Sequence, residues 1–83
     1  MDLLDVQIRE LGPGIAKRLG QARAAAGLTV RELADRANTT KNTIQALSDG
    51  KGASSRLELL ARVARAVKVT PEWLIFGIGD PGF

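Results

Sequence analysis

The stretch LTVRELADRANTTKNTIQALSDG, residues 28–50, contains two short helix patterns separated by a turn. Thr29 followed three residues later by Glu32 is a capping box, which is typical of a helix start. Asn38 lies near the middle of the stretch, and asparagine takes a left-handed turn more readily than most residues do. The first half is therefore predicted to be a helix that ends at a turn. Its expected inward residues are Leu33, Ala34 and Ala37.

A second helix is predicted in the other half of the stretch. Thr40 can cap its start, Ile44 and Leu47 share its apolar side, and it ends before Gly50. The two helices have roughly seven to nine residues each and are joined by residues 38–40. This is the layout of a helix-turn-helix, in which the second helix is presented to the DNA major groove.

Helix patterns also flank this unit, whereas strand patterns are nearly absent. One helix is predicted before it, ending at Gly27, and a fourth begins after it at a capping box of Ser55 and Glu58. Thr70 followed by Pro71 starts a short fifth helix. The fold class is therefore all-α, a compact bundle of five helices. The expected inward residues are Ile15, Leu19, Ala22 and Ala26 in the first helix, Leu57, Leu60, Ala61, Ala64 and Val67 in the fourth, and Trp73 and Leu74 in the fifth.

The chain of 83 residues has room for one small domain with a segment at each end. Residues 12–14, Gly-Pro-Gly, are expected to separate the first segment from the domain. Residues 1–13 are thus assigned to an N-terminal segment, either an extra helix or a frayed arm. Residues 14–76 form the predicted helix-turn-helix domain, and residues 77–83 form a linker or tail.

Composition excludes several classes of protein. The chain has no cysteine and no histidine, so zinc sites, Cys–His nucleophiles and Ser–His–Asp triads are ruled out. We expect no enzymatic activity, no cofactor and no metal. No apolar run approaches the roughly 20 residues that span a bilayer. The prediction is a protein without a membrane partner, located in the cytoplasm of a bacterium or a phage-infected host.

Charge is unevenly distributed along the chain. The net charge is +3, from 12 basic and 9 acidic residues. Residues 1–13 carry a net −2, residues 14–56 a net +5, and residues 57–83 are balanced. A positive field over the first half of the domain suits a polyanionic partner.

The second helix of the 28–50 unit is expected to expose side chains that read bases. With Ile44 and Leu47 inward, a spacing of 100° per residue turns Asn42, Gln45 and Ala46 outward. Asparagine and glutamine pair with adenine, lysine pairs with guanine, and an alanine methyl contacts the thymine methyl. The predicted base contacts are Thr40, Lys41, Asn42, Gln45 and Ala46.

The sequence resembles the lambda-repressor-like helix-turn-helix domains of phage repressors and Cro-type proteins. The resemblance covers about residues 14–79 and is carried by the following motifs: Ile15-Ala16-Lys17-Arg18-Leu19, Gly27-Leu28-Thr29, Glu32-Leu33-Ala34, Asp49-Gly50-Lys51 and Val69-Thr70-Pro71-Glu72-Trp73-Leu74. It implies the N-terminal domain of a phage-type repressor that binds a pseudo-palindromic DNA operator as a homodimer. In such repressors a C-terminal oligomerisation domain follows, and we expect it to be absent from this chain.

Two positions depart from the family pattern. Val30 stands where the family often has a phosphate-contacting glutamine, and Ser48 stands where a glutamate often pairs with the arginine at position 23. Arg23 is therefore expected to turn to Glu32, to Asp49 or to a DNA phosphate. The expected phosphate contacts are Lys17, Arg18, Arg23, Thr43, Lys51 and Arg56. Ile75, Phe76 and Ile78 are expected to be exposed apolar residues at a dimer interface.

The predicted function is that of a transcriptional regulator that binds double-stranded DNA sequence-specifically, most simply a repressor. Two alternatives remain open. One is an antitoxin or a restriction-modification controller on the same scaffold, which would also bind DNA. The other is a helical protein-interaction module without a DNA partner, whose binding would be insensitive to salt.

Overall fold

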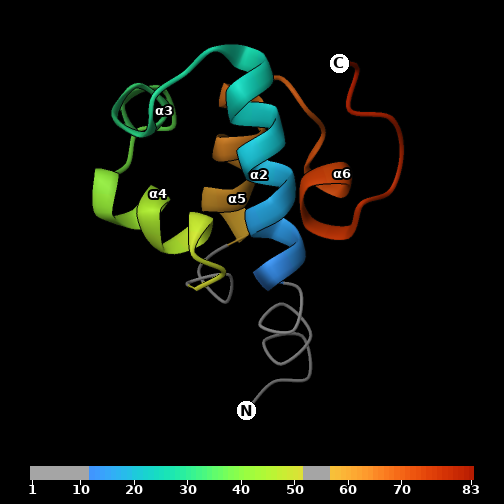
Figure 1. Cartoon of the computed structure of the whole chain (residues 1–83), viewed down its shortest axis with the longest axis horizontal. Helices are drawn as coiled ribbons and strands as arrows, with labels where there is room; N and C mark the ends of the chain where they lie inside the picture. The colour runs from blue at the N-terminus through green and yellow to red at the C-terminus, as the bar shows by residue number, and fades with distance from the viewer. Residues whose placement is uncertain (1–11, 52–56) are drawn as a thin grey trace.

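A computed structural model of the chain describes residues 12–51 and 57–83. In these ranges the chain forms five α-helices and no β-strand (Figure 1). The helices are α2 (Gly12–Ala26), α3 (Val30–Arg36), α4 (Lys41–Ser48), α5 (Leu57–Ala66) and α6 (Pro71–Phe76). The predicted all-α class is confirmed.

Helix α2 runs through the middle of the bundle, with α3 and α4 on one side and α6 on the other (Figure 1). It contacts α4 and α6, while α3 contacts both α4 and α5, and α5 also contacts α6. Helices this short are marginal in isolation, so they depend on packing against one another. The fold therefore fixes α4 through two neighbours, α2 and α3.

The described core is aliphatic, with Trp73 at its margin. No polar or charged side chain is buried among the described residues, so apolar burial holds the helices together. The largest fully buried side chains are Ile15, Leu19, Leu33, Ile44, Leu47, Leu60, Val63 and Leu74. The predicted inward faces of α3 and α4 are confirmed, and so is the burial of Trp73.

Three of the predicted helix caps are present. Thr29 accepts a hydrogen bond from the Glu32 backbone N–H at 3.1 Å, and the Thr29 N–H donates to Glu32 Oε1 at 2.9 Å. This is the complete capping box at the start of α3. Thr40 caps α4, and Thr70, followed by Pro71, caps α6. The start of each of these helices was therefore readable from the sequence.

The turn between α3 and α4 depends on a left-handed residue. Asn38 has a φ of 55°, as predicted, and the Thr39 N–H donates to the Ala34 carbonyl at 2.9 Å. The end of α5 repeats this geometry without a predicted signal. Lys68 has a φ of 62°, and the Val69 N–H reaches the Ala64 carbonyl at 3.0 Å.

Several expectations about helix bounds and faces are wrong. Residues 12–14 were expected to precede the first helix, but they form the first turn of α2, where a proline fits because no intrahelical partner is needed there. Their role in separating the N-terminal segment from the domain stays a prediction. Ala26 is exposed in the last turn of α2, and Leu57 is 45% exposed. The inward face of α5 is rotated relative to the prediction and includes Leu59 and Val63. Ile75, expected to be exposed, is buried against the core.

The last seven residues form no helix but fold back on the domain. The tail runs back beside α6 (Figure 1). The Phe83 ring meets the Trp73 ring edge to face, with centroids 5.6 Å apart. Pro81 and Phe83 also line a hollow of about 170 Å³ together with Ala25 near the end of α2. The linker role of residues 77–83 stays a prediction. The N-terminal segment up to residue 11 and the Ser55 cap lie outside the described residues.

Candidate nucleic-acid interface

Helix α4 presents a polar face to the outside of the bundle. Ile44 and Leu47 are fully buried, whereas Lys41, Asn42 and Gln45 on the other side are exposed. Thr40 is exposed at the N-terminal end and Ala46 is half-buried. The predicted orientation of the helix is therefore confirmed, and base contact by these five residues stays a prediction.

Two threonines close the N-terminal end of α4. The hydroxyl oxygens of Thr40 and Thr43 are 2.8 Å apart, and the Thr43 backbone N–H donates to Thr40 Oγ1 at 3.2 Å. These bonds fix the first turn of the helix, at the end that points into the groove in helix-turn-helix docking. Thr43 is half-buried, and its predicted phosphate contact is untested.

Farther along the same face, two polar side chains pair with each other. Gln45 Nε2 donates to Asp49 Oδ1 at 3.3 Å, one helical turn later. The neighbouring Ser48 turns inward, and its hydroxyl donates to the Ile44 carbonyl at 3.0 Å. The polar face of α4 therefore ends in an ordered pair of an amide and a carboxylate.

Arg18 lies against α6. Its Nε donates to the Leu74 carbonyl at 2.8 Å, and its Nη2 donates to the Ile75 carbonyl at 2.7 Å. These carbonyls belong to the last turn of α6 and have no intrahelical partners. The structure thus gives Arg18 a role in joining α2 to α6, which the sequence analysis missed. Its phosphate contact stays a prediction.

Arg23 also has a partner other than those expected. Its Nη1 donates to the Leu28 carbonyl at 2.7 Å, so the expectation that Glu32 or Asp49 is its partner is wrong within the described residues. Its contact with a DNA phosphate stays a prediction. The expectation that Arg23 is not left alone is confirmed. The bond closes the loop between α2 and α3, which the family pattern did not indicate.

The remaining predicted phosphate contacts divide into two groups. Lys17 and Lys51 are exposed, as a phosphate contact requires. Arg56 lies outside the described residues.

Arg31 and Arg36 are exposed on α3, the helix that packs on α4, and the sequence analysis did not single them out. Their signal was the excess of basic residues in this part of the chain.

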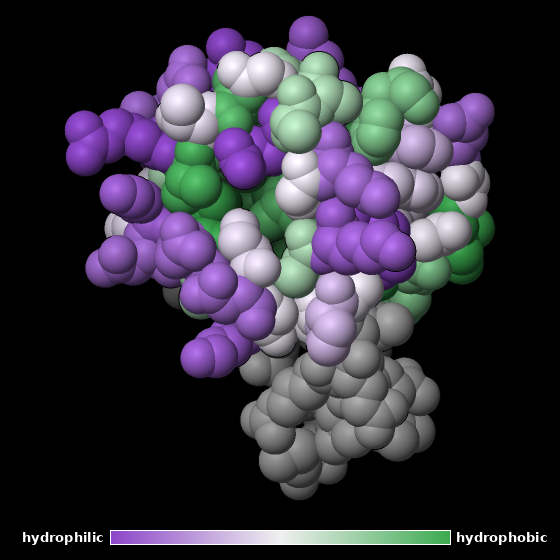
Figure 2. Space-filling model, in the orientation of Figure 1, coloured by the Kyte–Doolittle hydropathy of each residue, from purple (hydrophilic) through white to green (hydrophobic). Residues whose placement is uncertain are grey.

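The surface over α3 and α4 is hydrophilic. Figure 2 shows hydrophilic residues gathered along the edge that these two helices form. One acid there is already engaged: the hydrogen bonds to Glu32 from the backbone and side chain of Thr29 hold the pKa of that carboxyl below its ordinary value. Glu32 is thus a capping group.

Apolar side chains are exposed near the end of α6. Phe76 is 52% exposed and Ile78 is 63% exposed, whereas Ile75 is 5% exposed and packs inside. Of the three residues predicted for a dimer interface, two are available on the surface of the protomer. Pairing between protomers is untested.

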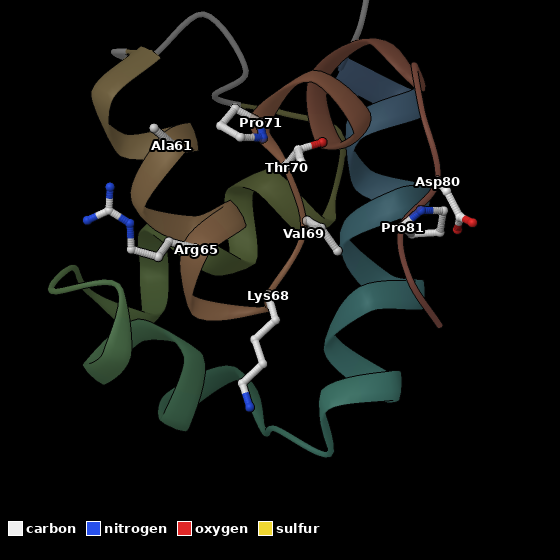
Figure 3. Close-up of a pocket in the computed structure, with 8 residues that line it drawn as sticks. All are labelled: Ala61, Arg65, Lys68, Val69, Thr70, Pro71, Asp80 and Pro81. Carbon is white, nitrogen blue, oxygen red and sulfur yellow. The ribbon is translucent and has the colours of Figure 1, made fainter.

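A separate hollow of about 510 Å³ lies among α5, α6 and the tail (Figure 3). Its polar groups do not converge. The ends of Arg65 and Lys68 point in different directions in Figure 3, and the Thr70 hydroxyl accepts a bond from the Trp73 N–H. No residue of α3 or α4 lines this hollow. It therefore lacks the concentrated polar groups that fix a small ligand.

The described residues offer neither a metal site nor a membrane-spanning helix. Across residues 12–51 and 57–83, no group of three or more acidic side chains is placed to hold a metal ion. Within the same ranges, no helix is both long and apolar enough to cross a membrane.

Comparison with known proteins identifies the family. The sequence profile of the helix-turn-helix domain matches residues 15–74. The chain belongs to the helix-turn-helix domain family. No solved structure matches this helix-turn-helix domain.

The helix-turn-helix domain is similar to transcriptional regulators. It is 42% identical over 66 residues to the HTH-type transcriptional regulator PrtR of Pseudomonas aeruginosa, covering 80% of this chain and 25% of PrtR. It is 34% identical over 68 residues to the HTH-type transcriptional regulators for conjugative element R391 of Providencia rettgeri and for conjugative element SXT of Vibrio cholerae, covering 82% of this chain and 31% of each. The chain thus spans about a quarter to a third of the length of these relatives. The resemblance to regulators with a helix-turn-helix domain is confirmed.

Proposed function

We propose that the chain binds double-stranded DNA sequence-specifically as the DNA-binding domain of a transcriptional regulator. The observation that carries the proposal is the orientation of α4, whose apolar side is fully buried and whose polar side is exposed. The major groove is about 12 Å wide and admits one helix. Helix α4 packs on α2 and α3, and in this proposal its exposed side enters the groove.

Base reading falls to side chains on the outward face of α4 and at its N-cap. Asn42 and Gln45 carry amides that pair with adenine, Lys41 is a donor for guanine, and Ala46 offers a methyl group to thymine. Thr40 stands at the start of the helix, where its hydroxyl serves either a base or the backbone. Together these five residues cover the polar face from the first turn to the last.

Phosphate contacts supply most of the affinity. Lys17 and Lys51 are exposed cations, and Arg31 and Arg36 add two more on α3. Each phosphate that such a residue neutralises contributes about −0.9 to the slope of log affinity against log salt. Four contacts for each domain therefore give a slope of about −3.6.

The regulator acts as a homodimer in this proposal. Phe76 and Ile78 form an exposed apolar pair at the end of α6, and such a pair loses contact with water when a second copy covers it. A two-fold dimer reads a pseudo-palindromic operator whose half-sites lie about 34 Å apart. Occupying a promoter in this way represses transcription in the cytoplasm of a bacterium or an infected host, with no chemical step.

The test is a selection of bound duplexes from random DNA, followed by competition at several salt concentrations. The proposal predicts an enriched palindromic sequence that outcompetes a scrambled duplex by about 10³-fold or more. It also predicts a steep salt slope. Absence of enrichment, with binding to a protein partner that does not change with salt, would instead support the interaction module.

The dimer has its own test. Replacing Phe76 and Ile78 by aspartate is expected to leave the helical content unchanged, because both side chains are more than half exposed. Sedimentation on the selected operator should then show one bound protomer where the wild type shows two. Two bound copies of the variant with unchanged affinity would place the interface elsewhere.

A further inference from the structure

Gln45 and Asp49 are tied to each other twice on the exposed face of α4. The Gln45 side chain donates from Nε2 to Asp49 Oδ1 at 3.3 Å. The Asp49 backbone N–H donates to the Gln45 carbonyl at 3.0 Å. The backbone bond fixes Asp49 one helical turn beyond Gln45. The carboxylate therefore stays within reach of the Gln45 amide.

The side-chain bond changes which groups the Gln45 amide can offer to a base. A glutamine amide has two N–H donors and one acceptor oxygen. A carboxylate can only accept, so the bond to Asp49 uses one N–H and orients the nitrogen toward Asp49. One N–H and the Oε1 acceptor remain for a ligand.

This remaining pair distinguishes the two purines. Adenine presents an acceptor at N7 and a donor at N6 in the major groove, which match one N–H and one acceptor. Guanine presents two acceptors, N7 and O6, and would need two donors. An amide with one N–H already engaged therefore suits adenine and not guanine.

Asp49 is also costly on a DNA-binding surface. It is the only acid between Thr40 and Gly50, and it is exposed. A negative charge on this face opposes the phosphates and lowers affinity for DNA of every sequence. Because its charge lowers affinity for all DNA, Asp49 can favour binding only by improving the recognition of a particular sequence.

We propose that Asp49 is a positioning residue that sets the base choice of Gln45, favouring adenine over guanine at the base pair that Gln45 reads. The proposal rests on the proposed function and names a specificity device within that same site. It makes Asp49 act through Gln45 and without contact to DNA of its own.

The experiment measures Kd on the four duplexes that differ at one base pair, for the full chain and the variants Gln45→Ala, Asp49→Ala, Asp49→Asn and the double alanine variant. The base pair is the one whose preference Gln45→Ala abolishes. Asp49→Ala should lower the adenine-to-guanine preference by about 2- to 12-fold, the worth of one hydrogen bond. Asp49→Asn keeps an acceptor oxygen and should retain most of the preference. In the Gln45→Ala background, Asp49→Ala should leave the ratio of the Kd values for the adenine and guanine duplexes unchanged.

The same data separate the loss of the Asp49 charge from the loss of its hydrogen bond. Removing the charge raises affinity for all four duplexes by one common factor, which cancels in the ratio of their Kd values. A common factor with an unchanged ratio in Asp49→Ala would overturn the proposal, because Asp49 would then act by charge alone. A base preference that survives Gln45→Ala at every base pair would also overturn it.

A second readout does not need DNA. The two side-chain amide protons of Gln45 should shift in the NMR spectrum of free Asp49→Ala and shift less in Asp49→Asn. Unchanged Gln45 amide signals in Asp49→Ala would show that the pair does not form and would overturn the proposal. Equal binding of all duplexes by the wild-type chain would instead refute the proposed function, so the two failures are distinguishable.

Discussion

Arg18 on α2 donates from Nε to the carbonyl oxygen of Leu74 on α6 at 2.8 Å, across 56 residues of sequence. Its Nη2 takes the next carbonyl, that of Ile75, at 2.7 Å. A planar guanidinium can bridge two such oxygens, whereas a lysine ammonium is a single point charge. The last turn of α6, beside the proposed dimer residues, is therefore closed by a side chain from α2.

Arg18→Ala should lower the free energy of unfolding by about 2–3 kcal/mol, because two charge-assisted bonds to carbonyls are lost. Urea unfolding followed by the fluorescence of Trp73, the only tryptophan, measures this. Lys17→Ala is the matched control, since Lys17 is an exposed neighbour and its removal should cost no more than about 0.5 kcal/mol. Equal losses in the two variants would contradict the assignment.

Replacing Gly20 in α2 and Gly27 just after it by alanine should change the stability of the fold in opposite directions. Gly20 lies inside α2 with open space where a Cβ would stand, so Gly20→Ala should stabilise by about 0.5–1 kcal/mol. Gly27 has equal space but a φ of +69°, so Gly27→Ala should destabilise by about 1–2 kcal/mol. Thermal unfolding of both variants checks this; a shift of the same sign in both would be inconsistent with the structure.

The capping box of α3 should make stability depend on pH. The pKa of Glu32 in the folded chain is lowered from its ordinary value of 4.5 by hydrogen bonds from Thr29. The stability that this carboxylate contributes is thus present above the ordinary value and is lost as the pH falls through the lowered one. The difference in unfolding free energy between wild type and Glu32→Gln should shrink below about pH 4.5. A difference that stays constant down to about pH 2.5 would rule out the linkage.

Lys51→Ala should weaken binding to every duplex by a similar factor and flatten the salt slope by about 0.9. The reason is that Lys51 is exposed three residues beyond the end of α4 and is proposed to contact a phosphate. Lys68→Ala removes the same charge at the end of α5 and serves as the control, with an unchanged slope. A sequence-dependent loss in Lys51→Ala would indicate base contact instead.

Local signals in the sequence were sufficient for the starts of α3, α4 and α6 and for the orientation of α4. Caps such as Thr29 and Thr40 act within one turn, and the Ile44 and Leu47 spacing records which side is buried. These effects depend on near neighbours in the chain, so a single sequence reveals them.

Contacts between distant residues could not be predicted in the same way. The bonds from Arg18 to α6 and the burial of Ile75 depend on where α2 and α6 meet, which no local pattern records. The left-handed Lys68 was missed for a different reason: lysine rarely takes that conformation, so the residue type carries no signal for it.

Base reading by the polar face of α4 is tested by the substitution Asn42→Ala. Asn42 is exposed on that face, and its amide can pair with adenine. The change should cost about 1–3 kcal/mol on the selected operator and little on scrambled DNA, measured as Kd by fluorescence anisotropy at one salt concentration. Equal losses on both duplexes, or no loss on either, would contradict the account.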